Sequence, residues 1–242
     1  MNARVGAATD VGAVRTSNED SHFTGERVFV VADGMGGHAA GEVASAMAVS
    51  HLGTLDSRPD LGPEDIRQAL ITANDAIRDA AVGGRAGMGT TATGLVSVTF
   101  AGSPHWVVFN VGDSRVYRFA EGALTMLTAD HSEAAEMVAA GTLTEDQARN
   151  SPFRNVITRA LGAYRAPEPD QWVCPPIPGE RFLLCSDGLT GEVEDDEIAS
   201  VLASTPNPAE AADTLVRRAV QAGGRDNVTV VVVDGPTPPP AP

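Results

Sequence analysis

The stretch VFVVADGMGG, residues 28–37, runs an apolar segment directly into one aspartate and a group of glycines. A short apolar run that is bounded by turn residues is typical of a buried strand. The same order returns in RFLLCSDGLTG (181–191), and aspartates also stand at strand edges in NVGDSR (110–115) and GGRDNVTVVVV (224–233). Four acids at the ends of predicted strands therefore need a common explanation.

The apolar pattern of the rest of the chain predicts runs of strands and runs of helices. Strands are predicted at 3–9, 27–32, 90–100, 105–111, 115–120, 169–174, 181–185 and 228–233. Helices are predicted at 41–52, from Pro63 to about residue 81, at 194–203 and at 208–221. Because these elements do not alternate strictly, the predicted fold class is α+β with mostly antiparallel sheet.

The length of 242 residues suits one large domain or at most two small ones. We expect one domain over residues 1–234. Within it, residues 128–162 are polar and mixed, and predict an insert with short helices at SEAAEMVAAG, TEDQAR and NVITRALG. Residues 235–242 include PTPPPAP, which is typical of an extended tail or the stub of a linker.

Charge and composition argue against several kinds of partner. The chain has 17 basic and 32 acidic residues and a net charge of −15, whereas nucleic acids and anionic membranes require a basic face. Two cysteines without a CxxC motif favour a reducing compartment. The N-terminus has no apolar core of a signal peptide, and no apolar run approaches the roughly 20 residues that span a bilayer. We therefore expect a cytoplasmic monomer that neither binds nucleic acid nor inserts into a membrane.

Taken together, the acids predict a metal site. Six carboxylates stand at or near predicted strand ends: Glu19, Asp20, Asp33, Asp113, Asp187 and Asp226. If these ends converge, the carboxylates crowd one cleft, and even one buried ion without a partner costs several kcal/mol. Hard oxygen ligands without a Cys or His cluster select Mg²⁺ or Mn²⁺ over zinc or copper. Gly34 and Gly188 would let the backbone approach closely enough for a carbonyl oxygen to become a ligand.

The glycine loop, the cysteine and the arginines of these motifs also allow other interpretations. The glycine loop after Asp33 also suits a simple turn that Asp33 caps. The sequence has no GxGxxG, GxxxxGK[ST], GxSxG or HExxH motif, and Cys185 is expected to be a small core residue. An arginine accompanies three acidic motifs, and a guanidinium suits either a phosphate or an ion pair. We expect the phosphate role for Arg15 and ion pairs with the neighbouring acids for Arg115 and Arg225.

Six motifs in order carry a resemblance to a known family. They are Arg15…Glu19-Asp20, Asp33-Gly34-Met35-Gly36-Gly37-His38, Gly89-Thr90-Thr91, Gly112-Asp113-Ser114-Arg115, Ser186-Asp187-Gly188 and Gly224-Arg225-Asp226-Asn227. In order and spacing, from about residue 4 to residue 234, the chain resembles the metal-dependent serine/threonine protein phosphatases, the PPM or type 2C family, in their compact bacterial form. Animal members tend to have a histidine two places after the aspartate, where this chain has Met35. The family's proposed histidine acid therefore has no match there, and His38 is only a hypothesis for that role.

The resemblance implies an α-β-β-α sandwich of two mostly antiparallel sheets flanked by helix pairs. Residues 1–234 would be the catalytic domain, and residues 128–162, the flap segment, would lie beside the cleft. The implied cofactors are Mn²⁺ or Mg²⁺, as two core ions and a weaker third. Asp33 would bridge the core ions, the Gly34 carbonyl would bind the second, and Asp187 and Asp226 would hold the first.

The resemblance also implies roles for the remaining residues of the site. Glu19 and Asp20 would act mainly through metal-bound waters, and Asp113 would share the weaker third ion with Asp187. Arg15 would bind the phosphoryl oxygens, which makes it both a catalytic and a substrate-binding residue. Two divalent ions that share a water lower its pKa enough to supply hydroxide near neutral pH. The implied reaction is hydrolysis of phosphoserine and phosphothreonine in proteins, opposing a bacterial serine/threonine kinase.

Three alternatives share parts of this pattern. A binding module that has lost catalysis would lack metal ligands, but every core ligand is present. A metal-dependent nucleotide hydrolase would share the acids, but should have a pocket for a base, and few aromatic residues stand near the motifs. A regulatory phosphatase of a sigma-factor pathway would share the chemistry and differ in its attached domains.

Overall fold

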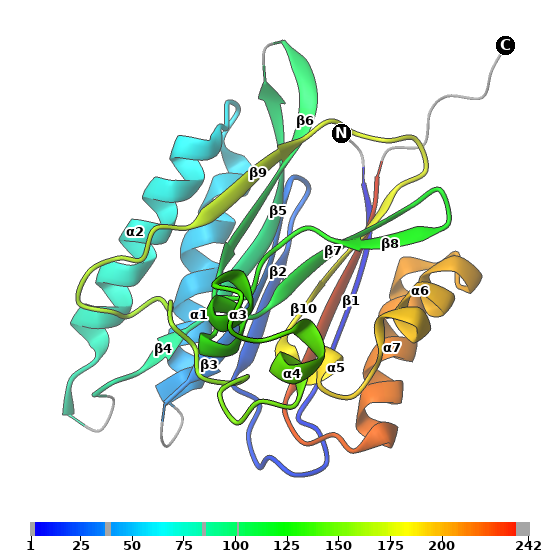
Figure 1. Cartoon of the computed structure of the whole chain (residues 1–242). Coiled ribbons are helices and arrows are strands. Elements are labelled where there is room, and N and C mark those ends of the chain that lie inside the picture. The colour runs from blue at the N-terminus through cyan, green and yellow to red at the C-terminus, as the bar shows by residue number, and fades with distance from the viewer. Residues whose placement is uncertain (1–2, 37–39, 84–85, 101, 236–242) are drawn as a thin grey trace, which may run out of the picture.

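Two antiparallel sheets lie face to face between two layers of helices (Figure 1). The computed structural model of the chain describes residues 3–36, 40–83, 86–100 and 102–235. One sheet contains, in order, β1 (Arg4–Asp10), β11 (Val228–Asp234), β10 (Arg181–Cys185), β7 (Arg115–Ala120) and β8 (Ala123–Met126). The other contains β2 (Asp20–Thr24), β3 (Val28–Met35), β5 (Ala92–Phe100), β6 (Ser103–Val111) and β9 (Asp170–Cys174), with β4 (Gly89–Thr90) paired to β3.

A pair of long helices covers the outer face of each sheet. Helices α1 (Ala40–Gly53) and α2 (Pro63–Ala80) cover the sheet of β3, and the 3₁₀ helix η1 (Thr54–Ser57) joins them. Helices α6 (Asp195–Ser204) and α7 (Pro208–Ala222) cover the sheet of β11, with the short α5 (Asp187–Thr190) before them. The predicted α+β class and its α-β-β-α layering are thereby confirmed.

The alternation of side chains along β3 explains why its sequence is continuously apolar. Val28, Val30 and Ala32 are fully buried against α1 and α2. Phe29 and Val31 point the other way, into the layer between the two sheets. In that layer the rings of Trp106 and Phe182 meet edge to face, with centroids 5.5 Å apart. A strand that is buried on both faces loses the polar alternation of a surface strand.

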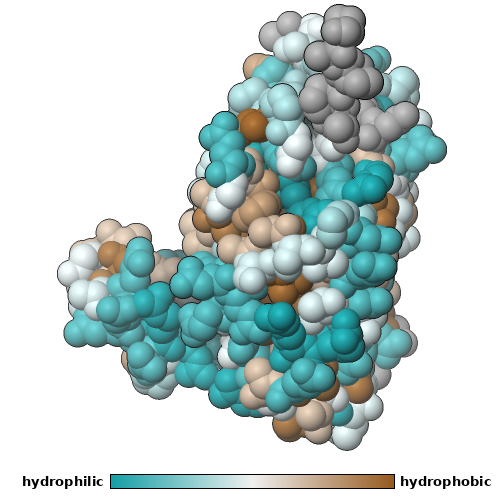
Figure 2. Space-filling view, turned by 90° about the vertical axis from the view of Figure 1, so that its right-hand side faces the viewer, coloured by the Kyte–Doolittle hydropathy of each residue, from teal (hydrophilic) through white to brown (hydrophobic). Residues whose placement is uncertain are grey.

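The flap segment lies at the lower front of the molecule in Figure 1. It contains two short helices, α3 (Glu133–Ala139) and α4 (Glu145–Arg149). Ser132 and Thr144 cap them, since each side chain accepts a hydrogen bond from a backbone N–H of the first turn. Turned to the side, the same part of the molecule forms a lobe that projects from the main body (Figure 2).

The structure contains all the predicted strands and long helices, and differs from the sequence analysis at a few places. Strands β2 and β8 were missed, and the predicted strand 90–100 is divided into β4 and β5 at Thr91. The prediction of a short helix at NVITRALG was wrong, because these residues form no helix. There, Ile157 and Leu161 make single β-bridges to Ser132 and Thr90, and Gly162 has φ of +96°. Tertiary pairing has overridden the local helical pattern.

Helices that could cross a membrane are absent from the described part of the chain, where none is both long and apolar enough. His38 and the proline-rich stretch 236–242 lie outside the described residues.

Candidate metal centre

Strand ends bring the predicted aspartates to one end of the sandwich, the lower end in Figure 1. Asp20 is the first residue of β2 and lies directly opposite Asp33, near the end of β3. Asp113 lies in the turn between β6 and β7. Asp187 begins α5 immediately after β10, and Asp226 lies just before β11. The antiparallel pairing therefore delivers carboxylates from both sheets to the same place.

The charges of these five side chains act on one another. Burial raises the pKa of Asp33 well above its usual value, and the negative charges of Asp20, Asp187, Asp113 and Asp226 raise it further. The pKa of Asp187 is also raised, first by burial and then by Asp226. Carboxyl groups that hold their protons this strongly form a site that favours positive charge.

Two of the carboxyl groups are buried and incompletely paired. Burial raises the pKa of Asp20 to about 7, although Ser186 donates a hydrogen bond of 2.7 Å to its Oδ2. Burial and the charge of Asp187 raise the pKa of Asp113 to about 7. The Oδ1 atoms of Asp20 and Asp113 are buried without a hydrogen-bond partner. An unpaired buried acceptor is costly, and a cation would satisfy it.

Gly34 is required by a close approach of three backbone segments. Its N–H donates to the carbonyl of Glu19 at 3.1 Å. A Cβ on Gly34 would lie 2.2 Å from the carbonyl oxygen of Gly41, at the start of α1, and 2.5 Å from that of Glu19. Any side chain here would push α1 away from β2. The predicted close approach is present, and the metal-binding role of the Gly34 carbonyl stays a prediction.

Arg15 lies at the rim of the carboxylate cluster. Its Nη2 is 2.6 Å from Oδ2 of Asp226, and this hydrogen bond raises the pKa of Arg15. Burial raises the pKa of nearby Glu19, while the charge of Arg15 opposes that shift. Arg15 is half exposed, so its guanidinium can reach a ligand that approaches from solvent.

The expected ion pairs of the other two arginines are present, but with different partners. Arg115 Nη2 is 2.7 Å from Asp130 Oδ2, and Arg225 Nε is 2.7 Å from Glu192 Oε1. The prediction that they pair with the acids beside them in the chain is therefore wrong. Neither guanidinium forms an ion pair with the acid beside it in the motif, although the charge of Arg115 still lowers the pKa of Asp113 against the larger effect of burial.

Hydroxyl groups in two of the motifs connect the metal-binding loops, and sequence reasoning gave them no role. Asp33 donates its backbone N–H to Thr91 Oγ1 at 2.9 Å, and Thr90 Oγ1 donates to the Asp33 carbonyl at 2.9 Å. Thr91 Oγ1 also lies 2.8 Å from Ser114 Oγ, which follows Asp113. These threonines belong to the Gly89-Thr90-Thr91 motif, whose sequence does not indicate which strand ends they contact. This network fixes the backbone of Asp33 relative to that of Asp113.

Asn227 fastens the N-terminal loop to the other side of the site. Its Oδ1 accepts from the Glu19 N–H at 2.8 Å, and its Nδ2 donates to the carbonyls of Val11 and Ser17. The side chain is 5% exposed. Asn227 therefore positions Glu19 and Asp20, a role that the GRDN motif alone did not reveal.

The donor atoms fit a hard divalent cation. All the side-chain candidates are carboxylates, and the buried Oδ1 atoms of Asp20 and Asp113 lack partners. Within residues 3–36, 40–83, 86–100 and 102–235, no group of three or more His, Cys, Asp or Glu side chains is arranged closely enough to hold a metal ion. Oxygen ligands of this kind suit Mg²⁺ or Mn²⁺.

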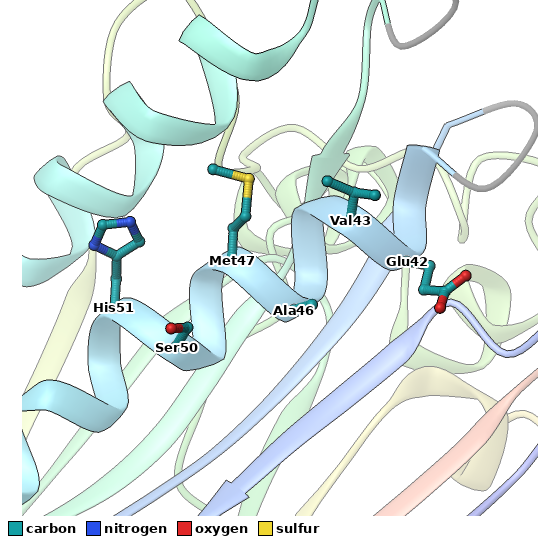
Figure 3. A pocket seen from close by; sticks show the side chains of 6 residues that line it. All are labelled: Glu42, Val43, Ala46, Met47, Ser50 and His51. Atoms are coloured by element: carbon teal, nitrogen blue, oxygen red, sulfur yellow. The ribbon is translucent and has the colours of Figure 1, made fainter.

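A separate surface hollow of about 340 Å³ lies along α1 (Figure 3). Six side chains of that single helix line it: Glu42, Val43, Ala46, Met47, Ser50 and His51. The hollow presents one carboxylate, and none of the clustered aspartates borders it. It is not the metal centre.

The fold and the clustered carboxylates define the class as a two-sheet α-β-β-α sandwich with a site for hard divalent cations. Residues 13–223 match the profile of the family described as protein phosphatase 2C. The chain belongs to this family, which confirms the resemblance to metal-dependent serine/threonine protein phosphatases.

Similar proteins of known name support this assignment. The chain is 40% identical over 238 residues to the serine/threonine protein phosphatase PstP of Mycobacterium tuberculosis, covering 96% of this chain but 45% of PstP. It thus spans less than half the length of that relative. It is 38% identical to the serine/threonine phosphatase stp of Listeria monocytogenes, covering 93% of each chain.

Solved structures give the same result in three dimensions. The crystal structure of M. tuberculosis PstP matches with a TM-score of 0.90 at 39% identity, covering 97% of this chain and 99% of that one. A structure of the PstP catalytic domain in complex with two manganese ions matches with a TM-score of 0.85 at 39% identity, covering 96% and 97% of the two chains.

Proposed function

We propose that this protein is a metal-dependent phosphatase that hydrolyses phosphoserine and phosphothreonine in proteins. The observation that carries the proposal is the convergence of five aspartates from both sheets, with unpaired buried oxygens on Asp20 and Asp113. Such a cluster needs cations and has the donor chemistry for them. Relatives that match this chain over nearly all of its length are named serine/threonine phosphatases.

The proposed metal ligands follow from the places of the side chains. Asp33 is central, because the charges of all the other aspartates in the cluster raise its pKa. Asp187 and Asp226 would hold the first core ion, and the Gly34 carbonyl the second. Bound Mn²⁺ or Mg²⁺ would supply Lewis-acid stabilisation of the phosphoryl oxygens and a water acidic enough to provide hydroxide near neutral pH. The two manganese ions in the similar PstP catalytic domain support two core sites.

Three further residues complete the proposed site around the core. Glu19 and Asp20 would hold waters of the metal ions, with Asn227 and Ser186 fixing their positions. Asp113 would hold a weaker third ion. Its buried, unpaired Oδ1 supports that role.

Arg15 would bind two phosphoryl oxygens of the substrate through its planar guanidinium. Its position at the rim, half exposed and beside Asp226, lets it reach a substrate that approaches the metal centre from solvent. A covalent phosphoenzyme is not part of the proposal. Cys185 is fully buried, and burial raises the pKa of its thiol to about 12, so it is not available as a thiolate.

We further propose residues 1–234 as the catalytic domain, with the flap segment beside the cleft, and phosphorylated proteins, including a serine/threonine kinase, as substrates. A cytoplasmic monomer is the proposed state. The hydrophilic character of most of the face drawn in Figure 2 supports the monomer. The net charge of −15 supports a partner other than nucleic acid.

The test is release of phosphate by chelator-stripped protein, with and without added Mn²⁺. Substrates are a phosphothreonine peptide, p-nitrophenyl phosphate and ATP. We expect hydrolysis of the first two only when Mn²⁺ is present, and loss of it with EDTA. Turnover of ATP in preference to the phosphopeptide would support the nucleotide hydrolase instead. Absence of any Mn²⁺-dependent hydrolysis would support the inactive binding module.

A further inference from the structure

Near the start of the flap segment, a buried histidine holds the backbone beside Asp113. His131 is 4% exposed, and its Nδ1 lies 3.1 Å from the backbone nitrogen of Gly112. The backbone N–H of His131 donates in turn to the Gly112 carbonyl at 2.9 Å. His131 thus satisfies both polar groups of the residue that precedes Asp113.

The hydrogen-bond partners fix the tautomer of this histidine. The Gly112 nitrogen can only donate, so Nδ1 must be the acceptor and the ring proton lies on Nε2. Nε2 lies 3.1 Å from Asp170 Oδ2 and donates to it. Arg159 Nη1 is 3.2 Å from the same ring nitrogen, and its own hydrogen bond goes to Asp170 Oδ1 at 3.0 Å. Arg159 lies in the flap segment, and Asp170 begins β9 after it.

Gly112 is confined on its other sides as well. Its φ is +109°, a conformation that side chains rarely adopt, and a Cβ would lie 2.5 Å from Thr91 Cγ2. Asn110 Nδ2 donates to the Gly112 carbonyl at 2.9 Å and to the Ala129 carbonyl at 3.0 Å. With Thr91 on one side and His131 on the other, the direction in which Asp113 leaves this turn is set by these contacts.

We propose that His131 is a positioning residue for the metal site, acting through the Gly112 backbone on Asp113. His131 itself belongs to the flap segment, and its ring links the turn that carries Asp113 to β9 through Asp170. Movement at the base of the flap is therefore transmitted to a proposed metal ligand. The metal part of this inference rests on the proposed function, whereas the positioning of Gly112 does not.

Two substitutions separate the two ends of the imidazole ring. In His131→Asn the amide oxygen reaches the place of Nδ1 and can accept from Gly112, but nothing reaches Asp170. In His131→Gln the amide reaches the place of Nε2 and can donate to Asp170, but the Gly112 N–H loses its acceptor. A role limited to core packing predicts that both variants behave alike.

The first readout is hydrogen exchange of the Gly112 amide in metal-free protein. We expect exchange on the order of tenfold faster in His131→Gln, the effect of about one lost hydrogen bond, and little change in His131→Asn. The second readout is the Mn²⁺ concentration needed for half-maximal phosphatase rate. It should rise in His131→Gln and not in His131→Asn, while KM for p-nitrophenyl phosphate stays unchanged in both.

The outcomes distinguish the positioning role from the proposed function. Equal Gly112 exchange in the two variants would overturn the positioning role, and so would an equal Mn²⁺ requirement. Failure of the proposed function would appear in the wild-type protein, as no Mn²⁺-dependent phosphate release at all. If His131→Gln does not fold, nitrogen chemical shifts of the wild-type imidazole decide the matter. A proton on Nε2 supports the inference, and a proton on Nδ1 contradicts it.

Discussion

Arg15 Nη2 lies 2.6 Å from Asp226 Oδ2, so the residue proposed to bind phosphate is paired with one proposed to bind metal. Both side chains are partly exposed, at 51% and 34%, so the pair is screened by solvent and readily exchanged. A cation at Asp226 would compete with the guanidinium for the same carboxylate. Metal binding would thereby release Arg15 toward the phosphoryl group, which places metal loading before productive substrate binding.

Arg15→Ala should mainly raise KM for a phosphopeptide and for p-nitrophenyl phosphate. Hydrogen bonds to charged groups contribute about 1.5–3 kcal/mol, so we expect roughly a 10- to 100-fold loss in kcat/KM. Affinity for Mn²⁺ should not fall, because a competitor for Asp226 is removed. Steady-state kinetics and calorimetry measure these two effects.

Arg225→Ala is the matched control for that variant. Arg225 adjoins Asp226 in the chain but pairs with Glu192, so its loss should leave KM unchanged. If Arg15→Ala lowers only the melting temperature and leaves KM at the wild-type value, Arg15 is a structural partner of the acids.

Asp187→Asn should abolish turnover while the fold stays intact, because it replaces an anionic metal ligand with a neutral one. Loss of several kcal/mol of metal stabilisation corresponds to about a 1,000-fold decrease in kcat. Burial and Asp226 raise the pKa of Asp187, so the neutral amide should relieve repulsion and leave metal-free protein at least as stable. Phosphate release and thermal melting in EDTA test both statements.

Asp196→Asn, in the first turn of α6, is the control and should retain full activity. Asp226→Asn is expected to behave like Asp187→Asn in turnover. Full activity of either ligand variant at micromolar Mn²⁺ would refute the two-metal assignment.

The stability of metal-free protein should fall as pH rises from about 4 to about 7. The pKa values of Asp20 and Asp113 are raised to about 7 in the folded protein, against about 3.9 in an unfolded chain. Between these pH values the folded state binds more protons than the unfolded state. The stabilisation that these two carboxyl groups contribute is therefore fully present below the unfolded pKa, and it is lost as the pH rises through the folded pKa. Melting temperatures in EDTA across this range measure the trend.

Mn²⁺ should reverse the same trend, since it binds the ionised carboxylates. The increase in melting temperature on adding Mn²⁺ should therefore be larger near neutral pH than at acid pH. The double variant Asp20→Asn, Asp113→Asn is the control and should show a flatter pH dependence in EDTA. The same slope in the double variant and the wild type would show that other groups cause it.

Asp113→Ala should retain the two core ions and lose most activity, or need far more metal to recover it. Asp113 offers one carboxylate to the proposed third ion, and a site with many water ligands binds Mg²⁺ or Mn²⁺ weakly. We expect on the order of 10- to 100-fold more Mn²⁺ for half-maximal rate. Calorimetric titration should show the tight sites retained and a weak site missing.

Asp60→Ala, at an exposed position, serves as the control for Asp113→Ala. If Asp113→Ala unfolds, the main role of Asp113 is to brace the turn between β6 and β7. Titration and turnover equal to wild type would show that Asp113 has no catalytic part.

Most of the fold could be predicted because its strands and helices have strong local patterns. Strands buried on both faces, such as β3 and β11, read as continuous apolar runs. Helix α2 begins at Pro63 and keeps Ile66, Leu70 and Ile77 on one buried face. The short β2 and β8 were missed because they are partly exposed and have little apolar periodicity. The helix expected at NVITRALG failed because pairing with distant residues is invisible to a local pattern.

The site could be predicted less completely than the fold. Strand-end aspartates were recognisable from the sequence, and in the structure the charges of the other four raise the pKa of Asp33. The ion-pair partners of Arg115 and Arg225 could not be recognised from the sequence, because Asp130 and Glu192 are distant in the chain. The polar supports Thr91, Ser186 and Asn227 carry no local signature of their targets. Their roles depend on which strand ends meet, and that is decided by the sheet topology.

The most direct test of the metal centre is anomalous diffraction from crystals of this protein grown with Mn²⁺. We expect two strong manganese peaks in contact with Asp33, one of them also contacting Asp187 and Asp226. We also expect that Arg15 no longer pairs with Asp226 in that crystal. Manganese peaks elsewhere on the molecule, with the aspartate cluster free of metal, would contradict the proposed metal centre.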